Sequence, residues 1–212
     1  TGVGPNGELT KVNIGSVPAA LEDIYNGPTG QPGATGPIDA NDDFTNVSTA
    51  VPPGTQNAFD PALVTIKHTV QNPSTNTVPL ANVTLEPISP TQAEGADSNG
   101  TAGKFGSNAA IPNGTQVTIK YDANGDGDYL DAGESAVYTY NSTLGVFVIA
   151  SGTKPVNVGT LAPGAQVNYV VEIDLPLDAT LTKPLSNIPI PILAFSDDDP
   201  VASPGYNGTL NI

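Results

Sequence analysis

The sequence predicts an all-β fold, either a sandwich or a barrel, built from about seven or eight short strands. Several segments alternate apolar and polar residues with the period of two that is typical of half-buried strands. The 212 residues include 23 Gly and 21 Pro, which favour turns and disfavour long helices. Only residues 19–25, AALEDIY, have a helical pattern.

The clearest strand pattern lies in residues 63–72, LVTIKHTVQN. There, residues 64, 66, 68 and 70 are expected on one face, and Thr65, Lys67 and Thr69 on the other. Residues 167–175, VNYVVEIDL, repeat this alternation. Shorter candidates, each bounded by Pro, Gly or Asn, are residues 81–87, 115–121, 135–140, 145–150 and 206–212.

Composition divides the chain into two regions. Residues 1–58 are rich in Gly, Pro, Asn and Thr, and we expect an extended, low-complexity N-terminal arm. Within this arm, Leu9–Ile14 is expected to form a short strand. Residues 27–37, GPTGQPGATGP, carry Gly at every third position and are interpreted as a solvated, polyproline-like loop. Residues 59–212 are assigned to the β domain.

The charge balance argues against some partners, and the absence of Met indicates a processed chain. The formal net charge is −15, with six basic residues that are all Lys. This argues against nucleic acid and anionic membrane surfaces, which need clustered basic side chains. No apolar run is long enough for a membrane span. Because the chain contains no Met, we expect a processed or excised product, and we predict an extracellular or cell-surface location.

The sequence does not predict an enzyme. The only His, His68, lies on the apolar side of its expected strand, where a structural role is favoured. The chain has no Cys, no Arg and no G-x-S-x-G motif, so the usual nucleophilic and phosphoryl-transfer sites cannot be assembled. Paired carboxylates of the glycosidase kind stay open as an alternative.

Residues 121–134, YDANGDGDYLDAGE, predict a calcium site. Asp122, Asn124 and Asp126 alternate, and Gly127 follows, as in the first half of an EF-hand loop. Oxygen ligands at alternate positions of a tight turn converge on one point and suit Ca²⁺. The candidate ligands are Asp122, Asn124, Asp126, Asp128, Asp131 and Glu134.

The second half of this loop departs from the EF-hand pattern. Gly133 stands where the bidentate Glu is expected, and Glu134 follows one residue later. Strand patterns rather than helices flank the loop. We therefore predict a calcium staple across a β-hairpin, and a bare solvated turn is the alternative.

The other acidic clusters and the N-glycosylation motifs are weaker indications of a functional site. Asp39–Asp43 and Asp197–Asp199 lack the spacing of the calcium loop, so solvated turns are favoured and metal binding stays open. The N-glycosylation motif occurs at Asn46, Asn82, Asn99, Asn113, Asn141 and Asn207.

Two stretches carry a family resemblance. Residues 64–90, VTIKHTVQNPSTNTVPLANVTLEPISP, and residues 158–176, VGTLAPGAQVNYVVEIDLP, resemble the conserved-repeat domain of large secreted bacterial surface proteins. The loop resembles those that accompany such domains in exported bacterial proteins, cyanobacterial ones included. The resemblance implies an immunoglobulin-like β-sandwich with a structural or adhesive role.

These expectations combine into a functional hypothesis. We expect a self-assembling subunit of an extracellular filament, pilus-like fibre or surface layer, with copies of itself as partners. Leu9, Val12 and Ile14 would mark a strand donated to a neighbour, and residues 205–212 are the second candidate. The alternative is a calcium-dependent adhesin or carbohydrate-binding module with surface glycans as partners.

Overall fold

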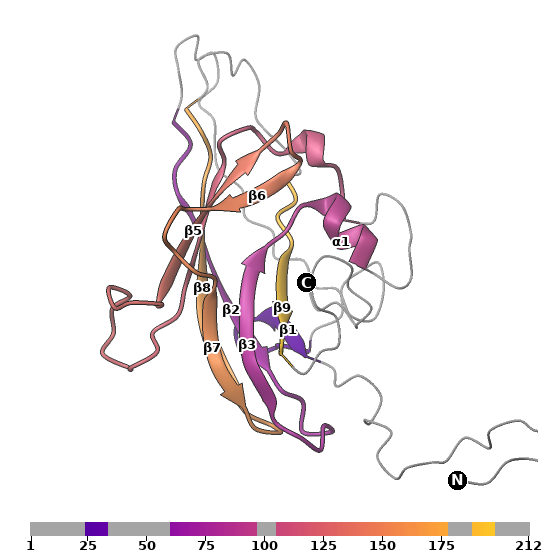
Figure 1. The fold of residues 1–212 in the computed structure, drawn as a ribbon, viewed down its shortest axis with the longest axis vertical. Helices are drawn as coiled ribbons and strands as arrows, with labels where there is room; N and C mark the ends of the chain where they lie inside the picture. The colour runs from indigo at the N-terminus through magenta and orange to yellow at the C-terminus, as the bar shows by residue number, and fades with distance from the viewer. Residues whose placement is uncertain (1–23, 34–59, 97–104, 178–187, 198–212) are drawn as a thin grey trace, which may run out of the picture.

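Within the described residues, nine strands in two antiparallel sheets form a β-sandwich, whose arrangement Figure 1 shows, and the predicted all-β fold class is confirmed. This computed structural model describes residues 24–33, 60–96, 105–177 and 188–197. The strands are β1 (Tyr25–Pro28), β2 (Val64–Gln71), β3 (Leu80–Pro87), β4 (Gln116–Lys120), β5 (Ser135–Asn141), β6 (Val146–Ile149), β7 (Val156–Leu161), β8 (Gln166–Asp174) and β9 (Ile192–Phe195).

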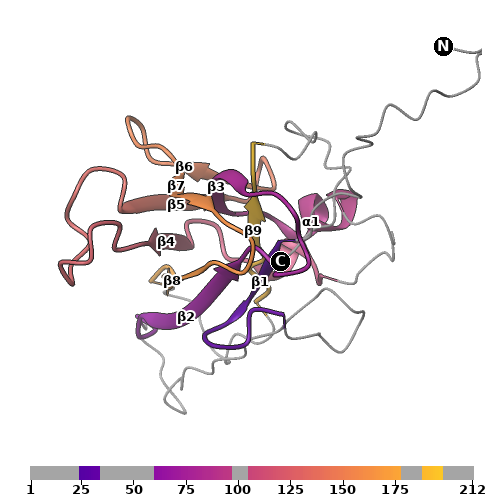
Figure 2. The same cartoon turned by 90° about the horizontal axis from the view of Figure 1, so that it is seen from below.

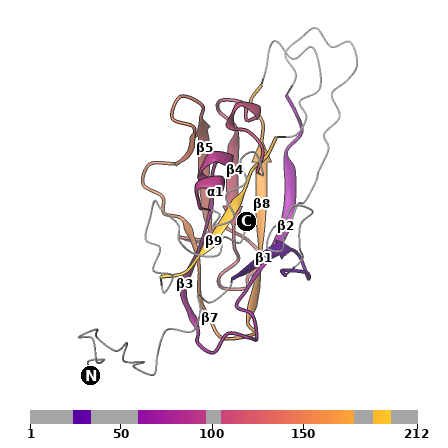
Figure 3. The ribbon, with the colours of Figure 1, turned by 90° about the vertical axis from the view of Figure 1, so that its right-hand side faces the viewer.

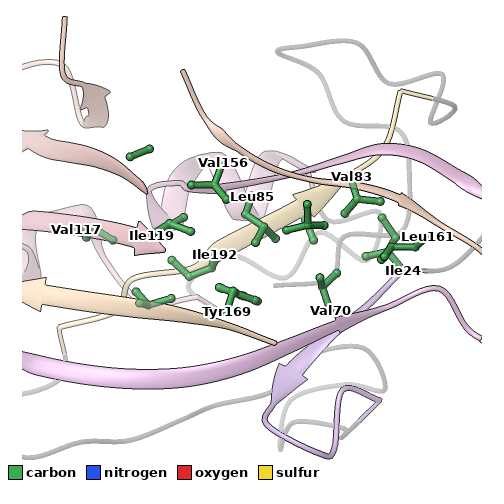
Figure 4. Close-up of a cluster of buried hydrophobic side chains, with 14 of the residues drawn as sticks. Ile24, Val70, Val83, Leu85, Val117, Ile119, Val156, Leu161, Tyr169 and Ile192 are labelled. Carbon is green, nitrogen blue, oxygen red and sulfur yellow. The ribbon is translucent and has the colours of Figure 1, made fainter. Parts of the chain in front are cut away.

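The larger sheet has six strands in the order β1-β2-β8-β4-β5-β6, and the smaller has three in the order β7-β3-β9. Figure 3 shows β5, β4, β8 and β2 side by side in this order. The smaller sheet covers one face of the larger one. Apolar side chains from both sheets fill the space between them, as Figure 4 shows for Leu85 of β3, Ile119 of β4 and Tyr169 of β8.

The period-two patterns located six strands close to their observed bounds, namely β2, β3, β4, β5, β6 and β8. The predicted strands at residues 9–14 and 206–212 lie outside the described residues. Three strands were not predicted. Each of β1, β7 and β9 is short or interrupted by Gly or Pro, so no alternation extends far enough to stand out.

The polyproline interpretation of residues 27–37 is wrong where the structure describes them. Tyr25–Pro28 forms β1 and pairs with β2, and residues 29–33 then turn back beside it. A Cβ at Gly27 would lie 2.9 Å from the Pro32 carbonyl oxygen, and one at Gly33 would lie 2.9 Å from the Tyr25 ring. These two glycines therefore permit close packing in a turn, which explains their spacing without a collagen-like repeat.

A short helix was also missed, α1 (Pro90–Ala96), and a 3-10 turn follows at Asn108–Ala110. Ser89 and Gln92 cap α1 reciprocally: the Gln92 N–H donates to Ser89 Oγ, and the Ser89 N–H donates to Gln92 Oε1. Ser-Pro-x-Gln is a capping box with Pro at the first helical position, so the signal was present in the sequence. Among the described residues, no helix is both long and apolar enough to cross a membrane.

A buried chain of hydrogen bonds joins the two sheets. The Tyr169 hydroxyl of β8 lies 2.6 Å from Asn26 Oδ1 of β1, and Asn26 Nδ2 donates to the Ile192 carbonyl of β9 at 2.9 Å. His68 Nδ1 of β2 lies 3.3 Å from the same hydroxyl, and its ring meets the Tyr169 ring edge-on. Tyr169 and Asn26 are both buried, so water does not compete for these bonds.

The hydrogen-bond directions in this chain determine the His68 tautomer. Asn26 Oδ1 can only accept, so the single hydroxyl proton of Tyr169 goes to it. The Tyr169 oxygen must then accept from His68, which places a proton on Nδ1. Burial lowers the pKa of His68 to about 4, so the ring is neutral at neutral pH and carries its single proton on Nδ1. The structural role expected for His68 fits this arrangement.

Removal of the hydroxyl from two buried tyrosines should have different effects on stability. Tyr169→Phe removes the hydroxyl that donates to Asn26 Oδ1 and should lower the free energy of unfolding by about 1–3 kcal/mol. Tyr138 is equally buried, but its hydroxyl has no hydrogen-bond partner in the described structure. Tyr138→Phe should therefore be neutral or stabilising. Urea unfolding of the two variants tests this, and equal destabilisation would contradict the network.

His68 should make stability depend on pH. Unfolded His68 binds a proton near pH 6.5 and folded His68 only near pH 4, so its contribution is complete above pH 6.5 and is lost as the pH falls to 4. The loss amounts to about 1.4 kcal/mol per pH unit across this window. The difference in unfolding free energy between wild type and His68→Gln should be flat above pH 7 and slope below 6.5. A difference that stays flat down to pH 4 would refute the burial effect.

Candidate metal-binding loop

The acidic loop, residues 121–134, connects β4 to β5, which are neighbours in the larger sheet. Lys120 and Ser135 form the last strand pair, and the Tyr121 N–H then donates to the Glu134 carbonyl at 2.8 Å. The loop thus closes a β-hairpin, and the expected strand flanks are observed. Figure 1 shows it extending to the left, away from both sheets.

The first half of the loop is a series of side-chain-to-backbone turns. Asp122 accepts from the N–H groups of Gly125 at 2.6 Å and Gly127 at 3.0 Å. Asp126 and Asp128 each accept from the N–H two residues later. These bonds turn the side-chain oxygens of alternate positions toward the loop backbone. Gly127 has a φ of 92°, a left-handed conformation that L side chains rarely adopt.

Glu134 links the two arms of the loop through hydrogen bonds. Its Oε1 accepts from the Ala123 N–H at 2.9 Å, and its Oε2 accepts from the Asp131 N–H at 3.2 Å. The side chain is only 2% exposed, although the rest of the loop faces solvent. A buried carboxylate needs hydrogen-bond donors, and the two N–H groups supply them. Glu134 therefore has a structural role whether or not a metal binds.

Asn124 lies between two of the other carboxylates. Its Nδ2 donates to Asp126 Oδ2 at 3.0 Å and to Asp131 Oδ2 at 2.6 Å. The amide hydrogens carry partial positive charge and so reduce the repulsion between these two groups. A cation would be attracted most strongly between these two oxygens, Asp126 Oδ2 and Asp131 Oδ2. The Asn124 amide thus supplies, between Asp126 and Asp131, part of the positive charge that a bound cation would supply.

The donor chemistry of the loop suits Ca²⁺, but the described arrangement is open. Carboxylate and amide oxygens are hard ligands, and each oxygen that accepts one N–H keeps a second lone pair. Among the described residues, however, no three His, Asp or Glu side chains lie close enough together to hold a metal ion. Calcium binding would require the carboxylates to draw together around the ion.

Only one of the other predicted acidic and assembly residues, Asp197, lies within the described residues. Asp197 accepts from Asn82 Nδ2 at 2.6 Å, and its N–H donates to the Ala81 carbonyl, so it fixes the irregular start of β3. Asn82 itself has a φ of 51°, which marks the register shift there. Leu9, Val12, Ile14, Asp39–Asp43, Asp198 and Asp199 lie outside the described residues.

Sequence analysis missed the contacts that Lys120 makes beside the loop. Its Nζ lies 2.7 Å from Glu172 Oε2 of β8 and 5.7 Å from the centre of the Tyr129 ring. Tyr129 is thereby held against the end of β4. The alternation of β4 predicts which face Lys120 occupies, but not the loop residue that folds back onto it.

Comparison of the chain with protein-family models, with curated proteins and with solved structures finds no match. The resemblance to the conserved-repeat domain therefore stays a prediction.

The buried carboxylate of Glu134 should contribute more to stability than the exposed ones. In Glu134→Gln, the new amide nitrogen cannot accept, so the N–H of Ala123 or Asp131 loses its partner. We expect a loss of about 1–3 kcal/mol in unfolding free energy with chelator present. Asp128→Asn is the matched control because it retains the Oδ1 that accepts from Leu130. Equal effects of the two substitutions would show that Glu134 does not hold the loop.

Proposed function

We propose that this chain is a structural subunit that assembles with copies of itself outside the cell, in a filament, pilus-like fibre or surface layer. The observation that carries the proposal is the open architecture of its sheets. A closed barrel has no strand edges, whereas this sandwich has edge strands β1, β6, β7 and β9 within the described residues. An open edge offers unpaired N–H and C=O groups to a strand from another molecule.

Several features support an extracellular role. The excess of 21 acidic over six basic residues keeps separate copies apart in solution until specific contacts form. The resemblance to conserved-repeat domains points to secreted surface proteins. Leu9, Val12 and Ile14 form the expected donated strand, and they precede the first strand of the sandwich in the chain.

Calcium belongs to this proposal as a stabiliser of the acidic loop. Asp122, Asn124, Asp126, Asp128, Asp131 and Glu134 would hold it. When bound, the ion would neutralise carboxylates that repel one another without it, and binding to the folded form alone raises stability by mass action. The loop would then stiffen the β4–β5 hairpin, which reaches out from the sandwich.

A direct test combines assembly with chelation. Purified wild-type protein and a variant that lacks residues 1–20 are observed by electron microscopy and sedimentation, each with calcium and with chelator. We expect ordered polymers only from wild type, and a melting temperature that chelator lowers for both chains. Monomers under all conditions would contradict the assembly proposal. A melting curve unchanged by chelator would contradict the calcium site.

A calcium-dependent adhesin or carbohydrate-binding module is the second candidate. Tyr129 beside the acidic loop is an aromatic side chain of the kind on which sugars stack, and it motivates this alternative. The ammonium group of Lys120 lies over one face of its ring, however, so that face is not free for a sugar to stack on. The geometry therefore favours the structural role.

A further inference from the structure

Edge strand β6 has the residue pattern of an interior strand. Its four residues, Val-Phe-Val-Ile, are all apolar. Phe147 pairs with the buried Tyr140, so it shares the core face of the sheet, and Ile149 lies on the same face. Val148 lies on the outer face and is 45% exposed. Strands that are apolar on both faces usually lie between two other strands with both faces covered.

The other three described edges carry protective features that β6 lacks. In β7, the Gly159 N–H is bonded to the side chain of Asn157 at an irregular point of the strand. β1 ends in Pro28, and Pro191 directly precedes β9. Irregularities, prolines and charges are the usual means of keeping edges from pairing with other chains. Because β6 has no charge, proline or glycine, it is the described edge best suited to accept a strand.

The hydrogen-bond pattern between β5 and β6 shows which backbone N–H and C=O groups of β6 point to the open edge. The Ala150 N–H donates to the Val137 carbonyl at 2.9 Å, so the Tyr138–Ile149 pair next to it is of the non-hydrogen-bonded type. By alternation, the N–H and C=O of Phe147 and Ile149 point away from β5, and those of Val148 point toward it. Within the described residues, β6 pairs with β5 alone. Two residues therefore present their backbone groups at the open edge.

We propose that the β6 edge binds residues 9–14 of a second copy of this chain as an added strand of the larger sheet. The inference rests on the proposed self-assembly and names its acceptor. Val12 and Ile14 share one face of an extended strand, and they would pack on the core side beside Phe147 and Ile149. Lys11 then lies on the outer face, near Val148.

The position of β1 gives the assembly a direction. β1 is the first described strand of the chain, and it lies at the opposite end of the larger sheet from β6, as Figure 2 shows. The donor segment precedes β1 in the chain and the acceptor is β6, so donor and acceptor are different parts of one subunit. Such a contact does not close on itself as a two-fold dimer does, and repetition gives an open, head-to-tail polymer.

The test uses full-length chains with one surface altered. Val148→Lys puts a positive charge on the outer face of the acceptor edge, near Lys11 of an incoming strand, and should abolish assembly while the chain remains folded. Val78→Lys is the matched control, since Val78 is 46% exposed and lies in the loop before β3. It should assemble as wild type does. Val146→Lys, also on the outer face of β6, is the second variant should Val148→Lys fail to fold.

Mixing experiments identify the occupant of the edge. The Val12→Asp, Ile14→Asp double variant retains its acceptor but loses its donor, and it should stay monomeric alone. Mixed with Val148→Lys, which retains its donor, it should form one-to-one dimers and nothing larger. Polymers of the double variant alone would show that another segment fills the edge and would overturn the inference.

Two further outcomes separate this inference from the proposed function. If wild type and Val148→Lys assemble equally, β6 is not the acceptor, but self-assembly stands. If wild type does not assemble under any condition, the proposed function fails and the inference fails with it.

Discussion

The hydrogen bonds from Tyr169 through Asn26 to the Ile192 carbonyl are the constraint on which the rest of the sandwich depends. They join β8, β1 and β9, and so they set where the smaller sheet lies on the larger one. Hydrophobic burial drives the sheets together but does not specify direction, whereas a buried amide must meet its partners in fixed geometry. This chain of bonds also holds β1 at its end of the larger sheet.

A second constraint acts at the far end of the β4–β5 hairpin. Glu134 is buried and accepts from both arms of the acidic loop, so the loop has a fixed shape before any ion arrives. Asn124 already lies between Asp126 and Asp131. Binding of a cation would still require the carboxylates to draw together around it. In the proposed role, calcium would stabilise the loop rather than switch it between two conformations, as calcium does in a sensor.

Sequence alone predicted the features that depend on local chemistry. Val64 to Val70 alternate because one face of β2 is buried, and the loop at residues 121–134 is dense in oxygen ligands at close spacing. It could not predict β1, because Gly27 and Pro28 form a strand only where β2 offers them a partner. Nor could it show that Asn26, Tyr169 and His68 meet, since they are far apart in the chain. The capping box at Ser89 is visible in the sequence, but the helix that follows it was not predicted because strand patterns surround it.

The proposed assembly depends on the β6 edge of the larger sheet, which would accept a strand from another molecule. Amide hydrogen exchange of the β6 residues tests it most directly, first in the monomeric Val12→Asp, Ile14→Asp variant and then in assembled wild type. The account predicts that the N–H groups of Phe147 and Ile149 exchange fast in the monomer and slowly in the assembly, with Val148 slow in both. Slow exchange of all three in the monomer would contradict it, because the edge would already be paired within its own chain.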